Sequence, residues 1–412
     1  MGKIQKQQWD LIVIGAGAAG ITAAITAARA HKKVLILEKQ NKSGKKLLAT
    51  GNGKCNFTNR DMRTECYHGD PAFIQQILDV FSVQNCLDFF YSVGIYPKEK
   101  NGYYYPNSEQ ATSVVLALMN ELHRLDVSIV YETNISAINR KENTIIVTTN
   151  KDCYHSRKLI IATGLLASPK LGSDGSLFDI IKGLGHHFQP ILPALCGYYC
   201  KGVDFKKIAG VRANGTVTAY INKKQVAHDT GEIQFTDYGL SGIPVFQISS
   251  FLSKGLYQQE NVQIAVNLLP DFDKVQLINE LNFRKKLCAE ETLSILLNGL
   301  INQKLSDMIW DKLHFDKNTF VHSLSDQDIV RIAEYLQDFR VLVTKYRDYE
   351  FAQVCTGGIP VTEIDIKTLE SKFIPNIYFA GEIIDVDGIC GGYNLHFAWA
   401  TGYIAGTAVA IE

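Results

Sequence analysis

The sequence predicts an α/β fold in which one nucleotide-binding domain is split between the two ends of the chain and encloses an inserted module. Three observations support this prediction. A glycine-rich segment near the N-terminus separates two apolar, strand-like segments, a strand–loop–helix pattern stands at the C-terminus, and short β patterns followed by helical patterns fill the middle. With 412 residues, the chain has room for two or three domains.

The N-terminal segment "LIVIGAGAAGITAAITAA", residues 11–28, carries no charge, which is also typical of a membrane span or a signal-peptide core. Its three glycines, Gly15, Gly17 and Gly20, would weaken a spanning helix by up to about 1 kcal/mol each. No small-residue cleavage site follows, because the segment continues into "RAHKK" and the strand-like "VLILEK". We therefore interpret it as part of a nucleotide-binding unit and not as a membrane anchor.

The order of strand, glycine turn, helix, second strand and acidic residue is that of a Rossmann-like dinucleotide-binding unit. Gly15 allows the tight turn, Gly17 allows the main chain to approach a pyrophosphate, and Gly20 allows the helix to lie against the strand. The helix N-terminus offers free N–H groups to phosphates. Glu38, at the end of the second strand, is expected to accept hydrogen bonds from the ribose of adenosine.

The charge and cysteine composition excludes several classes of partner. Lys plus Arg and Asp plus Glu number 42 each, so the formal net charge is zero, and we expect a small-molecule substrate with no nucleic-acid or membrane partner. The nine cysteines are scattered and complete no zinc pattern, which predicts reduced thiols and no metal site. Without an export signal, a cytoplasmic location is expected. The oligomeric state stays open.

Between the two ends, the pattern changes from helical to β and back. Residues 70–94 and 106–125 read as helices. Residues 127–160 contain four short strand candidates with "KEN" and "NKD" turns, which predict a β-meander that returns to the buried strand "KLIIATG". Short β runs continue from about residue 190 to 270, and helical patterns follow over 271–338 before "RVLVTK" resumes strand character.

The C-terminal segment carries a second strong signal. "IPNIYFAG" reads as a buried strand, and it is followed by an acidic, glycine-rich loop and a helix of small residues from about Leu395. This is again the pattern of a nucleotide-binding element. We therefore expect the two ends of the chain to form one discontinuous domain.

Three segments together resemble a known family: the glycine turn, "GKKLLATGNGKCNFTN" and "TLESKFIPNIYFAGEIIDVDGICGGYNLHFAWATGYIAG". They look like the BaiN/YhiN-type FAD-dependent oxidoreductases, which include bile-acid enone reductases and aminoacetone oxidases, and the resemblance covers nearly the whole chain. It implies an FAD-binding domain of glutathione-reductase type (residues 1–189 and 346–412). It also implies an inserted β-barrel (190–270 and about 339–345) and an inserted helical subdomain (271–338).

Carried over position by position, the resemblance implies that FAD contacts the glycine turn, the acid Glu38, the loop that follows it and the C-terminal loop. The implied cofactor-binding residues are Gly15, Ala16, Gly17, Ala18, Ala19, Gly20, Glu38, Lys39, Lys45, Lys46, Thr50, Gly51, Asn52, Gly53, Cys55, Asn56, Ile135, Thr163, Gly164, Gly381, Glu382, Asp387, Gly391, Gly392, Tyr393, Asn394 and Leu395. Ile135 would offer its backbone to the adenine. Residues 391–395 would place a helix N-terminus near the flavin pyrimidine ring, where it stabilises negative charge.

The sequence departs from the family pattern at four places. The usual "GGGRCN" reads "GNGKCN", so that Lys54 keeps the charge but loses the planar fork of arginine. "GRVFP" becomes "GYYYP", in which Tyr103 replaces an arginine on the substrate side. "ATGGxSxP" becomes "ATGLLASP", and "FTHxGLSGP" becomes "FTDYGLSGIP". All four changes are compatible with FAD binding, whereas the last three leave an inherited substrate preference open.

The sequence assigns no catalytic side chain, and each candidate keeps two interpretations. Cys55, Cys355 and Cys390 stand in or beside the flavin-loop segments, either as redox groups or as small residues that fill tight loops.

Histidines and tyrosines supply further candidates. His186, His187 and His396 are either proton donors or structural residues. The tyrosines 103–105 either line an apolar substrate pocket or pack in the core.

Three functions are compatible with this reading. The first is the reduction of a conjugated C=C bond in an apolar, steroid-like molecule, with NADH or NADPH as a transient electron donor. The second is an amine or amino-ketone oxidase that passes electrons to oxygen, and the third is a flavoprotein with a structural FAD and a partner-binding role. No second G-x-G-x-x-G motif follows the first, so no dedicated nicotinamide domain is expected.

Overall fold

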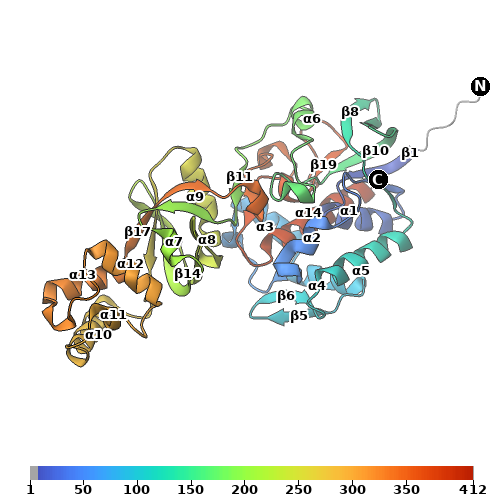
Figure 1. Ribbon diagram of the computed structural model, residues 1–412. Helices are drawn as coiled ribbons and strands as arrows, with labels where there is room; N and C mark the ends of the chain where they lie inside the picture. The colour runs from blue at the N-terminus through green and yellow to red at the C-terminus, as the bar shows by residue number, and fades with distance from the viewer. Residues whose placement is uncertain (1–7, 412) are drawn as a thin grey trace, which may run out of the picture. The chain divides into compact units, whose positions relative to one another are not determined.

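The chain forms two compact units. The computed structural model describes residues 8–411. One unit contains the residues up to Ile191 together with those from Gln353 onward, and the other contains Leu192–Ala352 (Figure 1). We call them the split unit and the inserted unit. Two distant parts of the sequence therefore build the split unit.

The split unit is built on a seven-stranded sheet with the order β7-β2-β1-β10-β9-β8, in which β19 is a further partner of β10. Strands β7, β2, β1, β10 and β19 run parallel, whereas β9 and β8 form an antiparallel meander with β10. The strands are β1 (Gln8–Ile14), β2 (Val34–Leu37), β7 (Ser128–Val130), β8 (Ile135–Lys141), β9 (Thr144–Thr149), β10 (Cys153–Ile161) and β19 (Ile377–Phe379). The apolar run of β1 is buried, as is typical of parallel strands.

One detail of the meander differs from the prediction. Of the four strand candidates in residues 127–160, the first, β7, pairs with β2 in the parallel part of the sheet. Only the other three form the meander. Strand β10 belongs to both parts of the sheet. Its first half pairs with β9 of the antiparallel meander, and its second half pairs with β19 of the parallel part.

Helices α1 (Ala18–Arg29) and α14 (Tyr393–Ala410) lie side by side, although they come from opposite ends of the chain (Figure 1). A Cβ atom added at Gly402 would lie 2.3 Å from the carbonyl oxygen of Ala19. One added at Gly406 would lie 2.6 Å from the carbonyl oxygen of Ala23. These approaches require glycine, and they place the middle of α14, at Gly402, against the first turn of α1.

Shorter elements complete the split unit. The helices include α2 (Lys45–Ala49), α3 (Pro71–Val80), α4 (Val83–Ser92), α5 (Ala111–Arg124) and α6 (Phe178–Gly183). A three-stranded sheet has the order β3-β6-β5, and β20 pairs with β4. The bounds of these and of the remaining strand are β3 (Thr58–Asn59), β4 (Tyr67–His68), β5 (Pro97–Lys100), β6 (Tyr103–Pro106), β18 (Val354–Thr356) and β20 (Asp387–Gly388).

The inserted unit contains a closed barrel with the order β12-β15-β14-β13-β16-β17. Its strands are β12 (Tyr198–Lys201), β13 (Arg212–Ile221), β14 (Lys224–Phe235), β15 (Gly239–Gly242), β16 (Val262–Asn267) and β17 (Phe339–Tyr346). The short strand β11 (Leu192–Ala194) and the helices α7 (Phe205–Ile208), α8 (Ile243–Gln247) and α9 (Ser249–Tyr257) accompany them. Between β16 and β17 the chain forms α10 (Lys274–Leu287), α11 (Leu293–Leu296), α12 (Gln303–Leu313) and α13 (Asp326–Gln337).

Candidate functional site

The glycine turn between β1 and α1 has the geometry that a dinucleotide requires. Gly15 has a φ of +102°, and a Cβ atom there would lie 2.6 Å from the carbonyl oxygen of Ala162. At Gly20, a Cβ atom would lie 1.9 Å from the carbonyl oxygen of Gly15 and 3.2 Å from the Val13 side chain. Gly17 differs, because a Cβ atom there would meet no atom within 4 Å. Two glycines thus allow internal packing, and the third exposes its backbone to open space.

Glu38 follows β2 and reaches back to this turn. One carboxylate oxygen accepts a hydrogen bond of 2.6 Å from the N–H of Ala16, and the other accepts one of 2.6 Å from the N–H of Gln40. Each oxygen keeps a second lone pair that can accept a hydroxyl hydrogen. The Thr133 N–H donates to the Glu38 carbonyl at 2.9 Å, which holds the start of β8, with Ile135, beside the acid.

The lysines of the following segment have protein partners. Lys39 forms an ion pair with Asp174, and the Lys45 ammonium donates to the side chain of Gln40 at 2.7 Å. Both lie on the Glu38 side of the site. Both ammonium groups therefore interact with neighbouring protein side chains.

The loop after α2 has an unusual backbone. Gly51, Asn52, Gly53 and Cys55 all have positive φ angles between 54° and 82°. Such a run turns successive backbone N–H groups to one side, a conformation that suits anions. At Gly53 an added Cβ atom would meet nothing within 4 Å. The side-chain oxygen of Asn56 is buried and has no hydrogen-bond partner among the described residues.

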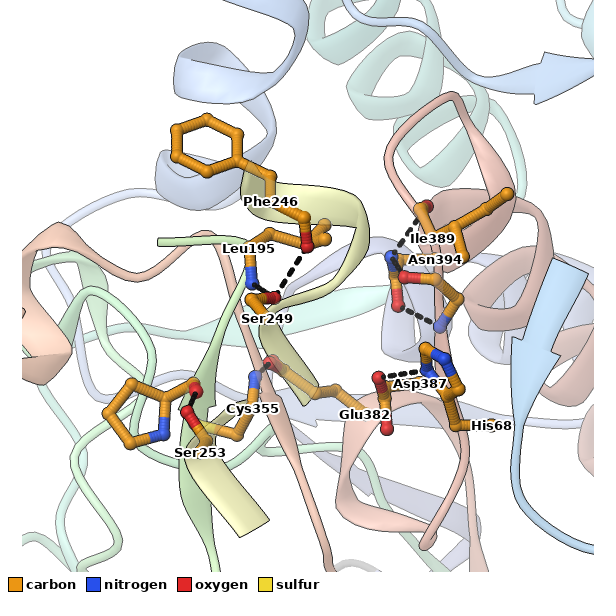
Figure 2. Close-up of polar contacts among 12 residues, drawn as sticks. His68, Leu195, Phe246, Ser249, Ser253, Cys355, Glu382, Asp387, Ile389 and Asn394 are labelled. Carbon is orange, nitrogen blue, oxygen red and sulfur yellow. Dashed lines mark hydrogen bonds and ion pairs between the residues drawn. The ribbon is translucent and has the colours of Figure 1, made fainter. Parts of the chain in front are cut away.

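The ion pair of Lys46 and Glu382 joins this loop to the C-terminal segment. The Lys46 ammonium lies 2.7 Å from one Glu382 oxygen. The other oxygen accepts the N–H of Cys355 at 2.9 Å (Figure 2). A Cβ atom at Gly164, which follows Thr163 after β10, would lie 3.2 Å from the same carboxylate. The hydroxyl of Thr356, the next residue after Cys355, is buried without a partner among the described residues. Three separate segments therefore meet at Glu382.

The loop between β20 and α14 brings further predicted residues to the same place. Asp387 is buried and lies 2.9 Å from Nδ1 of His68 (Figure 2). Asn394, in the first turn of α14, accepts the Gly388 N–H at 2.8 Å and donates to the Gly388 carbonyl at 2.7 Å. A Cβ atom at Gly392 would lie 2.9 Å from the unpaired oxygen of Asn56. The start of α14, with Tyr393 and Leu395, thus faces the loop that follows α2.

These observations test whether the site fits FAD. The open face of Gly17 fits a pyrophosphate, and the free lone pairs of Glu38 fit ribose hydroxyls. Two buried oxygens have no partner among the described residues. That of Asn56 lies beside Gly392, and that of Thr356 belongs to the residue after Cys355, whose N–H bonds Glu382. Polar atoms of a bound group would satisfy both oxygens. The residues present therefore fit a flavin dinucleotide.

Comparison with known proteins identifies the family. The model of the HI0933-like protein Rossmann domain matches residues 9–408, almost the whole chain. The chain belongs to this family. The predicted family, the Rossmann-type fold and the enzyme class, an FAD-dependent oxidoreductase, are confirmed at this level.

Two curated relatives and one solved structure are informative. A protein of Clostridium scindens named 3-dehydro-bile acid delta(4,6)-reductase is 39% identical over 97% of this chain and 98% of its own length. An Escherichia coli protein named ribosomal RNA dihydrouridine synthase is 29% identical over 96% of this chain and 97% of its own. The Sdh1 complex of Mycobacterium smegmatis in the apo form aligns with a TM-score of 0.51 at 12% identity, over 99% of this chain and 68% of that chain, and supports the fold alone.

A cleft of about 220 Å³ lies in the split unit. Strand β6 alternates its side chains, so that Tyr103 and Tyr105 share the face that lines the cleft, and Tyr104 does not line it. The other lining residues are Lys54, Lys100, Asn101 and Glu109.

The cleft borders the predicted flavin loops. A Cβ atom at Gly391 would lie 3.0 Å from the Tyr103 ring, and one at Gly51 would lie 3.7 Å from the Tyr105 ring. Sequence reasoning missed Lys100, Asn101 and Glu109, although "KNGYYY" carries an Asn-Gly turn signal that predicts the hairpin.

Charge is balanced at the rim of this cleft. The Glu109 carboxylate forms ion pairs with the ammonium groups of Lys54, at 2.8 Å, and Lys98, at 3.3 Å. These two lysines lower the pKa of the Glu109 carboxyl. Burial and the neighbouring Tyr103 raise the pKa of Tyr105. The Tyr105 phenol is therefore protonated at neutral pH and can donate a hydrogen bond.

The histidine candidates have structural contacts. His396 is fully buried, with Nδ1 2.8 Å from the Thr58 hydroxyl and Nε2 3.0 Å from the Phe81 carbonyl. His186 and His187 both bond the carboxylate of Glu363, at 2.9 and 2.8 Å. Burial lowers the pKa of His396 to about 4 and also lowers that of His186. The geometry favours the structural interpretation for all three.

The cysteine candidates also favour packing. Cys55 and Cys355 are buried, and burial raises the pKa of both thiols, that of Cys55 to about 12. A thiolate, which redox exchange requires, is therefore strongly disfavoured at these two positions.

No helix within residues 8–411 combines the length and apolarity needed to cross a bilayer. Within the same residues, no group of three or more His, Cys, Asp or Glu side chains is placed to hold a metal ion.

Proposed function

We propose that this protein reduces a C=C bond conjugated to a carbonyl group in an apolar small molecule, and that NADH or NADPH acts as a transient electron donor. The observation that carries the proposal is the cleft lined by Tyr103 and Tyr105, whose rings lie against Gly391 and Gly51 of the two predicted flavin loops. The two tyrosine rings offer apolar surface, and the charged and amide side chains of the other lining residues supply the polar groups that orient a small-molecule ligand. The cleft has a volume of about 220 Å³.

In this proposal the chain holds FAD through the turn from Gly15 to Gly20, through Glu38, and through the loops at residues 45–56, 163–164 and 381–395. When bound, FAD supplies the two-electron chemistry that saturates the double bond. Glu38 fixes the adenosine end, and the Lys46–Glu382 pair closes the loops around the cofactor. The N-terminus of α14 contributes a partial positive charge.

Tyr105 has the protonation state that this reaction needs. Addition of a hydride to a conjugated double bond develops negative charge on the carbonyl oxygen and requires a proton at the neighbouring carbon. A phenol with a raised pKa can donate a hydrogen bond to that oxygen. We assign this role to Tyr105, since its hydroxyl has no partner among the described residues.

The names of the two curated relatives are consistent with one kind of chemistry. A 3-dehydro bile acid with a delta(4,6) system has double bonds conjugated to its ketone, and the double bond reduced to make dihydrouridine is conjugated to a ring carbonyl. A uridine in RNA is therefore the second candidate substrate. The zero net charge favours the small molecule, because RNA binding depends on phosphate neutralisation.

The experiment is anaerobic stopped-flow spectroscopy of the FAD-loaded protein. We expect NADH or NADPH to bleach the flavin and a steroid enone to restore its colour, whereas uridine-containing RNA has little effect. Colour restored by RNA alone would support the second candidate. Rapid bleaching by amines, with no bleaching by either nicotinamide, would support the oxidase and contradict the proposal.

Tyrosine variants separate the two half-reactions. Tyr105→Phe should leave bleaching by the nicotinamide unchanged and slow the reaction with the enone by about 100-fold, the usual cost of losing one hydrogen-bond donor to a developing negative oxygen. Tyr104→Phe is the matched control, because Tyr104 lies on the same strand but does not line the cleft. Equal behaviour of the two variants would contradict the role of Tyr105.

A further inference from the structure

One face of the β5–β6 hairpin carries two lysines beside the tyrosines of the cleft. Lys98 stands opposite Tyr105 in the register of the two strands, and Lys100 stands opposite Tyr103. Directly opposite residues of an antiparallel pair project to the same side of the sheet. The four side chains therefore share one face, and Lys100 is itself a lining residue of the cleft.

The acid of this face does not neutralise Lys100. Glu109 uses one carboxylate oxygen for Lys54, at 2.8 Å, and the other for Lys98, at 3.3 Å. Within residues 8–411, no carboxylate pairs with the Lys100 ammonium. Three ammonium groups and one carboxylate therefore leave two positive charges beside the tyrosine rings.

The other acid of the hairpin lies on the opposite face. Glu99 stands opposite Tyr104, which does not line the cleft. The Glu99 carboxylate accepts the N–H of Gly102 at 2.6 Å and lies 3.9 Å from the guanidinium of Arg60. The Gly102 carbonyl in turn accepts the N–H of Arg60 at 2.7 Å. The backbone of the hairpin turn is therefore held in place by residues that do not line the cleft.

A phosphate group suits the charge at this end of the cleft. A phosphate monoester carries a charge of about −1.5 to −2 at neutral pH, which matches the two positive charges of this face. A lysine ammonium binds phosphate as a compact point charge, and the side-chain amide of Asn101, another lining residue, can donate a hydrogen bond. The rings of Tyr103 and Tyr105 offer flat apolar surface next to these groups.

The proposed electron donor is a nucleotide, so its phosphate groups need a binding site. No second G-x-G-x-x-G motif follows residues 15–20, and a second glycine turn is therefore not available to bind them. We propose that Lys100, together with Asn101, binds a phosphate group of the nicotinamide donor. This inference rests on the proposed function and adds to it the place at which the donor is held while it reduces the flavin.

Two reductants that differ only in a phosphate test this inference. Reduced nicotinamide mononucleotide has one phosphate, and reduced nicotinamide riboside has the same ring and ribose without it. Each is mixed anaerobically with the FAD-loaded protein, and the rate of flavin bleaching is measured over a range of concentrations. We expect the mononucleotide to half-saturate the wild-type protein at a concentration at least about tenfold lower, the usual effect of a charge-assisted hydrogen bond. Added salt should reduce this preference, because Lys100 is exposed.

Three variants assign the preference to this face. Lys100→Gln should reduce it to about threefold or less, because the charge-assisted contact is lost. Glu109→Gln should increase it, because it removes the acid of this face, and a damaged fold does not produce an increase. Arg60→Gln is the matched control and should keep the wild-type preference, since it removes a positive charge beside Glu99, on the opposite face of the same hairpin.

Three results would overturn the inference. The first is equal half-saturating concentrations of the two reductants for the wild-type protein, and the second is an unchanged preference in Lys100→Gln. The third is the same loss of preference in Arg60→Gln, which would show a general effect of charge. Equal weakening of both reductants in Lys100→Gln would show a packing role and would contradict the phosphate site as well.

Reoxidation of the flavin by a steroid enone keeps this test separate from the proposed function. If the enone restores the colour but the mononucleotide has no advantage, the phosphate site is wrong and the reductase stands. If the preference depends on Lys100 but no enone restores the colour, the proposed substrate is wrong and the phosphate site stands. If neither reductant bleaches the flavin, the inference is contradicted.

Discussion

Thr58 and His396 are joined by a hydrogen bond of 2.8 Å, although 338 positions separate them in the sequence. Since Nε2 of His396 faces the Phe81 carbonyl at 3.0 Å, that nitrogen carries the proton and Nδ1 accepts the Thr58 hydroxyl. Neutral imidazole satisfies both contacts at once. The ring therefore links α14 to two segments of the N-terminal half of the sequence.

The first prediction concerns pH. The pKa of His396 is about 4 in the folded protein, against 6.5 for an ordinary histidine, so that protonation favours unfolding. Its contribution is fully present above about pH 6.5 and is lost as the pH falls towards about 4. The gap between these pKa values corresponds to about 3 kcal/mol. Denaturant unfolding at several pH values should show this loss.

The variant His396→Gln separates this effect from other titrations, because glutamine carries no charge at any pH. It should be less stable than the wild-type protein near neutral pH and lose less of its stability on acidification. A parallel decline of the two proteins would show that His396 does not contribute to the pH dependence.

The second prediction concerns the contact of α1 with α14. Gly402→Val should lower the free energy of unfolding by about 1–3 kcal/mol, because a Cβ atom there meets the Ala19 carbonyl at 2.3 Å. FAD retention should fall as well, since α14 would shift against α1, which carries the glycine turn. The control is Gly183→Ala in α6, where a Cβ atom meets nothing within 4 Å. Thermal melting and flavin content are measured for both variants. If Gly402→Val has the stability and the flavin content of the wild-type protein, the close packing of α1 and α14 is contradicted.

The third prediction concerns Glu38. Glu38→Ala should weaken FAD binding by one or two charge-assisted hydrogen bonds, roughly 1.5–3 kcal/mol each. FMN, which lacks adenosine, should bind the wild-type protein and the variant equally weakly. Glu38 also accepts the N–H groups of Ala16 and Gln40, so the stability of the flavin-free protein must be measured in parallel. Unchanged FAD affinity would remove Glu38 from the site.

The fourth prediction concerns the thiols. Cys55 and Cys355 should resist alkylation in the native protein at about pH 8, because burial raises the pKa of each well above that value. Cys55→Ala and Cys355→Ala should keep the rate of flavin reduction. Mass spectrometry after a timed reaction with iodoacetamide measures the first claim. Loss of turnover in a well-folded alanine variant would restore the redox interpretation.

The sequence predicted the elements whose spacing is dictated by local chemistry. The glycine turn and Glu38 could be found because a tight turn, an open backbone and an acid must stand at fixed positions along a β-α-β unit. The parallel strands could be found because buried strands are continuous apolar runs. The C-terminal "FAGE" segment could also be found because its strand is a continuous apolar run. In the structure its acid, Glu382, pairs with Lys46.

Other features depend on distances that no local pattern encodes. Nothing near Glu382 in the sequence indicates that its carboxylate bonds both Lys46 and Cys355. The pairing of β7 with β2 was missed, because a strand of three residues looks the same in a meander and at the edge of a parallel sheet. The division into three domains stays a prediction.

The position of α14 has a consequence for synthesis of the protein. The ribosome releases β1 and α1 first, but α1 must wait for α14, the last helix of the chain, before its small-residue face is covered. At about 5–20 residues per second, that interval is on the order of tens of seconds. The inserted unit can fold during this time, because all of its strands emerge before α14. The nascent chain thus carries a finished barrel while its first strands still lack their final partners, and chaperones that shield apolar strands have their longest opportunity to act there.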